Sequence, residues 1–245
     1  GDMEFWIDWS KYIFNHGFTH VYDNPECNYL PAYLYVLRFH AKIQGSLQDI
    51  QDNMYTIKYY TFIFDVAGAY LAVWFVKDNT KKLFYFLMLM FNVAYIYNTT
   101  LWGQVDAIFT FFGFAAIVLA IEKKTIFSAL SLLIALNFKL QALVFIPIVG
   151  LILLPQLFSK EGLKKIVIAV LIGVCLQIII LWPFIISGRV YQVLNVITTS
   201  VDKYPYPAVG AFNLWTLLLF NRTIEGMYDI TDAVKFGFLT YKQIG

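Results

Sequence analysis

Three long stretches without a charged side chain dominate this 245-residue sequence. They run from Leu83 to Val105, from Leu140 to Ser159 and from Ile166 to Gly188, which is 23, 20 and 23 residues. A helix needs roughly 20 predominantly apolar residues to cross a bilayer. Only 14% of the residues are charged and 60% are hydrophobic, whereas about 25% are charged in an ordinary soluble domain. The sequence therefore predicts an all-α, polytopic membrane protein.

Several classes of function lack support in the sequence. The formal net charge of +2 and the absence of a Lys/Arg cluster exclude a nucleic-acid partner. The three histidines do not have zinc-ligand spacing, and the chain has no Gly-rich phosphate loop. Cys27 falls in a polar loop and Cys175 in an apolar run, so we expect one in water, one in lipid, and no disulfide between them.

The apolar runs predict six membrane spans with short connectors. Their expected ranges are Tyr59–Val76, Leu83–Thr99, Ala107–Ile121, Thr125–Asn137, Leu140–Phe158 and Ile166–Ile186.

Lysines gather in every second connector and so predict the orientation. Cytoplasmic loops carry the excess of Lys and Arg. We therefore expect residues 1–58 and 187–245 on the exoplasmic side, flanking a bundle at 59–186, and we expect further helices beyond both ends of the chain. The closing segment is expected to hold a re-entrant segment or a further helix. The eight lysines are Lys77, Lys81, Lys82, Lys123, Lys124, Lys160, Lys164 and Lys165.

The third and fourth spans are expected to be short, about 15 and 13 residues, which at 1.5 Å per residue reach only about 20 Å. The polar residues after the fourth span, Asn137, Lys139 and Gln141, then lie at membrane depth. Polar groups are tolerated there only inside protein or beside a wet cavity. We therefore predict a cavity at the exoplasmic side.

The opening segment is predicted to form an amphipathic helix on the membrane surface. Its polar residues Glu4, Asp8, Lys11 and Asn15 recur at helical spacing, with aromatic and aliphatic residues between them. Asp2 at the N-cap and Gly17 just past the end mark its limits.

Two aspartates at the starts of helices are candidate site residues. Asp2 opens the amphipathic helix, and Asp106 follows Trp102 and Gln104 in the shortest exoplasmic connector. Each carboxylate could instead only cap the free N–H groups of its helix. We include Trp102, Gln104 and Asp106 as candidate substrate-binding residues.

Two cations are candidates for binding a phosphate. The Lys139 ammonium at the tip of a helical hairpin is costly at membrane depth unless it snorkels or meets an anion, and a phosphate is such an anion. Arg189 follows the last span and could bind a phosphate bidentately, or could face lipid headgroups. Gln141 is included with them as a substrate-binding candidate. We expect Asp2, Asp106 and the turn Asn137–Gln141 to converge on the predicted cavity, with the Asp2 carboxylate and the Lys139 ammonium facing each other across an open space.

Five sequence blocks together resemble one family. In order they are GDMEFWIDW from Gly1, CNYLPAYLYVL from Cys27, LWGQVDAIF from Leu101, LNFKLQALVFIPI from Leu136 and YPYPAVGAFNLW from Tyr204. Their order and spacing are similar to those of the bacterial relatives of the GPI-anchor mannosyltransferases, in the GT-C superfamily of membrane glycosyltransferases. The fourth block also resembles, more distantly, the dolichyl-phosphate-glucose glucosyltransferases that extend N-glycan precursors.

The resemblance implies a GT-C-like helical bundle that transfers a hexose, mannose or glucose, from a polyprenyl-phosphate donor to a hydroxyl of a glycan or lipid-linked acceptor. It implies inversion at the exoplasmic face of a bacterial cytoplasmic membrane, with Asp2 as general base. We expect no required metal, although Asp2 and Asp106 could together hold a divalent ion. The alternatives are a secondary transporter, for which the sequence shows no internal repeat, and a noncatalytic subunit of a membrane complex.

Overall fold

The computed structural model describes residues 2–199, 206, 233 and 235–240. The chain divides into two compact units, Gly1–Val196 and Ile197–Gly245. In the second unit, β1 (Lys235–Phe236) and β2 (Leu239–Thr240) pair as a short antiparallel hairpin. All other regular structure in the described residues is helical, which confirms the predicted all-α class. The block from Tyr204 to Trp215 lies outside the described residues except for Tyr206.

Sixteen helical elements lie between Met3 and Thr199 in the part of the chain that the structure describes. Elements marked η are 3₁₀ helices, except η3, which is a π-helical turn. In order they are α1 (Met3–His16), η1 (Phe18–Asp23), α2 (Pro31–Gln44), α3 (Leu47–Asp52), η2 (Met54–Ile57), α4 (Lys58–Ala72), α5 (Asn79–Met90), α6 (Val93–Ile96), η3 (Tyr97–Trp102), α7 (Asp106–Ile121), α8 (Thr125–Phe138), η4 (Leu140–Val144), α9 (Phe145–Leu153), η5 (Leu154–Phe158), α10 (Lys160–Ile186) and α11 (Val190–Thr199).

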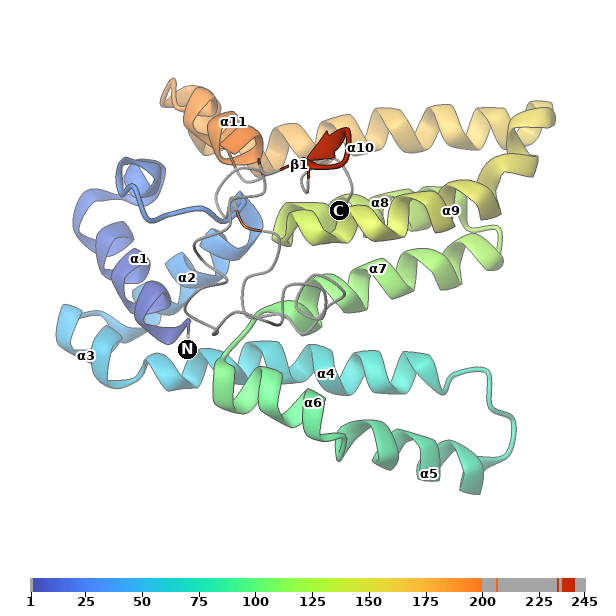
Figure 1. Ribbon diagram of the computed structural model, residues 1–245, viewed down its shortest axis with the longest axis horizontal. Helices are drawn as coiled ribbons and strands as arrows, with labels where there is room; N and C mark the ends of the chain where they lie inside the picture. Colours follow the sequence, from blue (N-terminus) through green and yellow to red (C-terminus); the bar gives the residue numbers. More distant parts are fainter. Residues whose placement is uncertain (1, 200–205, 207–232, 234, 241–245) are drawn as a thin grey trace. The chain divides into compact units, whose positions relative to one another are not determined.

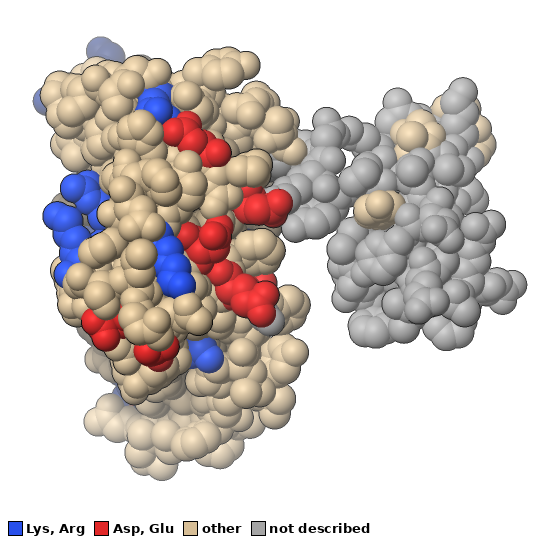
Figure 2. All heavy atoms as spheres, turned by 90° about the vertical axis from the view of Figure 1, so that its left-hand side faces the viewer, with Lys and Arg blue, Asp and Glu red and all other residues tan. Residues whose placement is uncertain are grey.

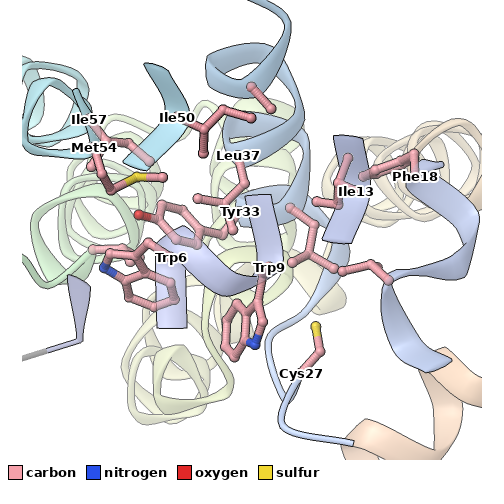
Figure 3. Packing of buried hydrophobic residues seen from close by; sticks show 14 of the residues in the cluster. Trp6, Trp9, Ile13, Phe18, Cys27, Tyr33, Leu37, Ile50, Met54 and Ile57 are labelled. Atoms are coloured by element: carbon pink, nitrogen blue, oxygen red, sulfur yellow. The ribbon is translucent and has the colours of Figure 1, made fainter. Parts of the chain in front are cut away.

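The elements from α1 to η2 form a lobe, called here the α1–η2 lobe, around a cluster of large side chains (Figure 3). Trp6 and Trp9 lie on the inner face of α1 and are each 1% exposed. Their rings meet edge to face at 5.2 Å, and Trp6 also meets Tyr33 of α2 at 4.7 Å. Helix α1 thus has the predicted limits, with its apolar face buried against α2. Cys27 is buried in this cluster, so the expectation that it faces water is wrong.

The longer helices form a bundle that extends away from this lobe (Figure 1). Helix α7 packs against α4, α8 and α9, and α8 packs against α10. The three lysine-bearing connectors lie together at the end of the bundle remote from the α1–η2 lobe (Figure 1). The surface of the lobe at the opposite end carries acidic and basic side chains interspersed with uncharged ones (Figure 2).

Each of the six predicted spans is helical over most of its expected range. The segments Leu140–Phe158 and Lys160–Ile186, of 19 and 27 residues, are long and apolar enough to cross a membrane. Helix α10 begins earlier than predicted because the Ser159 hydroxyl caps it, accepting a hydrogen bond from the Gly162 N–H at 3.0 Å. Helices α7 and α8 are short apolar helices of 16 and 14 residues, as expected.

The second predicted span is broken rather than continuous. Asn79–Met90 and Val93–Trp102 together are apolar enough for one span but bend by 48° at the break. Asn92 causes a new start there, since its side-chain oxygen accepts a hydrogen bond from the Ala94 N–H at 2.8 Å. An Asn side chain that caps a helix competes with continuation of the preceding one. Counting this bent pair, the described part of the chain has up to three segments of membrane-spanning length and apolarity, against six predicted.

Candidate active site

Asp2 is placed by the first turn of α1 but does not cap that helix. Its side chain makes no capping hydrogen bond. One carboxylate oxygen instead accepts a hydrogen bond from the Trp102 indole N–H at 3.2 Å, and the other accepts one from the side-chain amide of Gln104. The connector that supplies both donors is 100 residues further along the chain. The Asp2 carboxylate is therefore held by a second segment, not by its own helix.

The connector that carries Trp102 and Gln104 is fixed by two hydrogen bonds. The buried Trp6 indole N–H donates to the Gly103 carbonyl at 2.9 Å, and the Lys58 ammonium donates to the Thr100 carbonyl at 2.6 Å. Gly103 ends η3 in the left-handed region at φ +77°, and a Cβ there would lie 2.5 Å from the Met3 sulfur. Glycine suits this position because it adopts positive φ without steric cost.

Gln104 connects the acidic and basic parts of the site. Its NH₂ group donates to Asp2, while its carbonyl oxygen accepts a hydrogen bond from the Lys139 ammonium at 3.2 Å. These two partners fix which end of the amide faces which charge, because only the NH₂ end can donate. The sequence predicted an open space between Asp2 and Lys139. The Gln104 side chain lies there instead, and the two charged groups do not pair directly.

Lys139 lies just past the end of α8 and is 16% exposed, so little water is available to solvate its charge. The Lys139 Nζ atom is 2.5 Å from an Asp106 carboxylate oxygen. It also lies 5.9 Å from the ring centroids of Tyr29 and Phe109, within the usual reach of a cation–π interaction. The side chain is therefore turned into the protein rather than outward to the interface.

Asp106 is the first residue of α7, and the N-cap position of this helix is held by Val105. Asp106 pairs with Lys139 and also lines a cavity of about 410 Å³. The cavity lies among α4, α6, η3, α7 and the start of α9, with mainly apolar walls. Its lining residues are Phe64, Asp65, Gly68, Ala72, Ala94, Tyr95, Asn98, Asp106, Ala107, Thr110, Phe111, Phe114 and Phe145. This cavity adjoins the charged network through Asp106, but Asp2 and the turn Asn137–Gln141 are not part of its lining, so it is not the cavity predicted around that turn.

Other candidate residues lie apart from this network. Arg189 donates to the Asp23 carboxylate, which also lies 3.0 Å from the His20 ring nitrogen. The hydrogen bond from Arg189 is the main cause that lowers the pKa of the Asp23 carboxyl below its ordinary value. Gln141 in η4 is exposed, and no hydrogen bond of its side chain reaches the network among the described residues.

Asn137 also has a partner outside the network, although the turn that it begins was expected to converge on the site. Its amide exchanges two hydrogen bonds with Gln177 of α10, at 2.7 and 3.2 Å. Of that turn, only Lys139 reaches the network.

Aromatic residues near the network were missed by the sequence reasoning. Tyr29 and Phe109 lie over Lys139, and Tyr33 lies near Asp2. Burial, with smaller contributions from Tyr29 and Asp2, raises the pKa of the Tyr33 phenol well above its ordinary value, so this hydroxyl keeps its proton. All three belong to the quoted blocks that begin at Cys27 and Leu101, so the blocks themselves contained the signal.

Within the described residues, no three or more His, Cys, Asp or Glu side chains are grouped so as to hold a metal ion. Asp2 and Asp106, the acidic pair considered in the sequence, have separate partners in this structure.

Comparison with known proteins gives one family match. The family model described as ALG3 protein matches residues 24–221, which is 198 of the 245 residues. Trp102, Gln104, Asp106 and Lys139 lie inside the matched range, and Asp2 precedes it. No curated protein and no solved structure matched the chain. Because the match covers most of the sequence, the chain belongs to the ALG3 family of membrane glycosyltransferases, which use a lipid-linked sugar donor.

Proposed function

We propose that this protein transfers mannose, with glucose as the second candidate, from a polyprenyl-phosphate donor to a hydroxyl of a glycan or lipid-linked acceptor. The transfer inverts the anomeric centre and takes place at the exoplasmic face of a bacterial cytoplasmic membrane. The network of Asp2, Gln104, Lys139 and Asp106 is the proposed reaction centre. The resemblance to relatives of the GPI-anchor mannosyltransferases supports mannose as the sugar.

One observation carries the proposal: the Gln104 amide lies between the Asp2 carboxylate and the Lys139 ammonium, so that these two groups do not pair with each other. Glycosyl transfer from a lipid phosphate needs a base on one side of the anomeric carbon and positive charge on the other. A direct Asp2–Lys139 ion pair would satisfy each charge with the other. With an amide between them, the carboxylate keeps lone pairs available to a third group.

Asp2 is the proposed general base. A carboxylate has about four lone-pair sites, and Trp102 and Gln104 take up two of them. The acceptor hydroxyl donates to a remaining site, and Asp2 takes its proton as the oxygen forms a bond to the anomeric carbon. The two fixed donors also hold the carboxylate in one orientation, which favours a productive geometry.

Lys139 is the proposed phosphate-binding residue. As the new bond forms, the bond between the anomeric carbon and the phosphate oxygen breaks, and the electron pair leaves with the phosphate. An ammonium with little exposure to water stabilises this developing charge more strongly than a solvated one. We assign no phosphate contact to Arg189, because it pairs with Asp23 outside the network.

A transfer assay tests the proposal. Purified protein is incubated with a panel of radiolabelled polyprenyl-phosphate sugars and a panel of glycan and lipid-linked acceptors, and the product linkage is determined. Asp2→Asn should lower the rate by about 10²–10⁴-fold, the usual contribution of a general base. Asp8→Asn is the matched control, because Asp8 lies on the same helix and its carboxylate accepts a hydrogen bond from the Asn24 side chain at 2.6 Å, outside the network.

The outcomes separate the competing functions. Transfer that depends on Asp2 but not on Asp8 supports the proposal. A protein that moves a solute across vesicles without forming a glycosidic bond would instead be a transporter. Full activity of Asp2→Asn would remove Asp2 as the base, and retention at the anomeric carbon would exclude single displacement.

A further inference from the structure

We infer that Asp106 is a displaceable counterion, which occupies the phosphate position on Lys139 until the donor arrives and then turns toward the neighbouring cavity. This inference rests on the proposed function, since it assumes that Lys139 binds the phosphate of a lipid-linked donor. Asp106 is then a positioning residue that acts through Lys139.

The first step of the argument concerns what Lys139 requires. Its ammonium has three N–H donors, of which one reaches Gln104 at 3.2 Å and one reaches Asp106 at 2.5 Å. A lysine that is only 16% exposed needs an anion, because burial of an unpaired charge is strongly unfavourable. Asp106 supplies that anion in this structure. A carboxylate and a phosphate oxygen are chemically similar acceptors, so the two ligands compete for one position.

The second step concerns charge. Asp2, Asp106 and Lys139 together carry a formal charge of −1 before any donor binds. A sugar phosphodiester brings a further negative charge to the ammonium. With Asp106 still in place, two anions would lie within a few ångströms of each other in a partly desolvated site, where their repulsion is strong. Donor binding therefore favours departure of the Asp106 carboxylate.

The third step concerns where the carboxylate can go. Asp106 lines the 410 Å³ cavity, in company with Asn98 and Thr110, whose side chains carry N–H and O–H donors. Its side chain is 35% exposed, about twice the exposure of Lys139. Because Asp106 is also the first residue of α7, the positive end of the helix stabilises the carboxylate in either position. A rotation of this side chain therefore has both space and partners.

The same competition assists product release. Breaking the glycosyl bond leaves a phosphate monoester, which binds Lys139 more strongly than the diester through its extra charge. The return of Asp106 to Lys139 opposes that binding. A variant without the carboxylate should therefore bind phosphates more tightly and release the lipid phosphate more slowly.

Binding measurements with three ligands test the inference. The ligands are a polyprenyl monophosphate, the corresponding uncharged polyprenol, and inorganic phosphate, each titrated into the purified protein in detergent. Asp106→Asn should bind the polyprenyl phosphate about tenfold more tightly than the parent, because a competing charge is removed, and should bind polyprenol equally. Asp106→Glu keeps the charge and should stay near the parent. Asp23→Asn is the control, since it removes an ion-paired carboxylate outside the network.

Weaker or unchanged binding by Asp106→Asn would overturn the inference, because a purely structural partner of Lys139 should lose affinity when it is neutralised. Equal tightening in Asp23→Asn, or tightening for inorganic phosphate alone, would also overturn it. If Asp106→Asn is poorly folded, the ligand-induced rise in its melting temperature should still exceed that of the parent. A parent protein that binds no polyprenyl phosphate would refute the proposed function itself, which is a distinguishable result.

Discussion

Replacement of Lys139 by methionine should separate catalysis from folding. Methionine retains much of the aliphatic chain of Lys139 but loses the ammonium, which lies 5.9 Å from the ring centroids of Tyr29 and Phe109. If Lys139 stabilises the departing phosphate, kcat/KM for the lipid-linked donor should fall by about 10²–10³, the loss typical when one charge-stabilising donor is removed from an active site. Most of the change should appear as weaker donor binding and slower transfer, with a modest effect on folding.

The folding cost follows from the exposure of the ion pair. Removal of one partner of a fully buried pair costs about 3–5 kcal/mol, whereas an exposed pair contributes about 0–1 kcal/mol. Lys139 is 16% and Asp106 35% exposed, so solvent screens the pair in part. We expect Lys139→Met to lower the free energy of unfolding by about 1–2 kcal/mol.

A double variant distinguishes the two effects. Lys139→Met combined with Asp106→Asn removes both charges, so it should recover most of the lost stability because no unpaired carboxylate remains. It should not recover transfer. The assay pairs donor kcat/KM with the thermal unfolding midpoint in detergent. Unchanged kcat/KM in Lys139→Met, or recovery of transfer together with stability in the double variant, would refute the assignment of Lys139 to the phosphate.

Three further predictions test the surrounding structure. Gly103→Ala should lower the free energy of unfolding by about 1–2 kcal/mol, because alanine is strained at φ +77°. The same change should lower the rate of transfer, because the new Cβ would displace the connector from Met3. Unchanged activity would mean that the geometry of the connector does not position the site. His40 is buried, and neither ring nitrogen has a partner among the described residues. Burial lowers the pKa of His40 in the folded state below 6.5, so the unfolded chain takes up a proton first as the pH falls. The melting temperature should therefore drop as the pH falls below about 6.5, less so in His40→Leu, and equal pH profiles would contradict this. For topology, a membrane-impermeant thiol reagent applied to intact cells should label Gln48→Cys but not Asn79→Cys, both at exposed positions; the reverse pattern would invert the orientation.

The helices of this protein are largely predictable from sequence because their signals are local. The opening helix is bounded by Asp2 and Gly17, as predicted, and the fourth span ends within one residue of its expected limit. Apolar runs, charged connectors and caps all lie within a few residues of the features that they determine. The break at Asn92 has an equally local cause, because the Asn92 side chain caps a new helix. The sequence did not predict this break, because Asn92 lies inside a long uncharged run that favours one continuous span.

Partners within the site were less predictable because they depend on which distant segments meet. The contacts of Asp2 with Trp102 and Gln104 join residues about 100 positions apart. Arg189 has a guanidinium group that could bind a phosphate, yet it donates a hydrogen bond to Asp23 of η1. Nothing in the local sequence around Arg189 identifies that neighbour, since the contact is set by how η1 packs against α10.

The Asp106–Lys139 pair differs from these contacts, because helix lengths alone favour it. Helices α7 and α8 have 16 and 14 residues and are joined by a short turn at Glu122–Lys124. The two helices are about 24 and about 21 Å long, so the second one returns the chain to the end of the bundle at which the first one began. Asp106 begins the first helix and Lys139 follows the second, so an antiparallel hairpin brings the two residues to the same end. With opposite charges at that end and little water nearby, pairing is more favourable than a cap bond for Asp106 or an outward turn for Lys139. The lengths of the two helices, and not the residues next to Asp106, therefore determine that Asp106 pairs with Lys139.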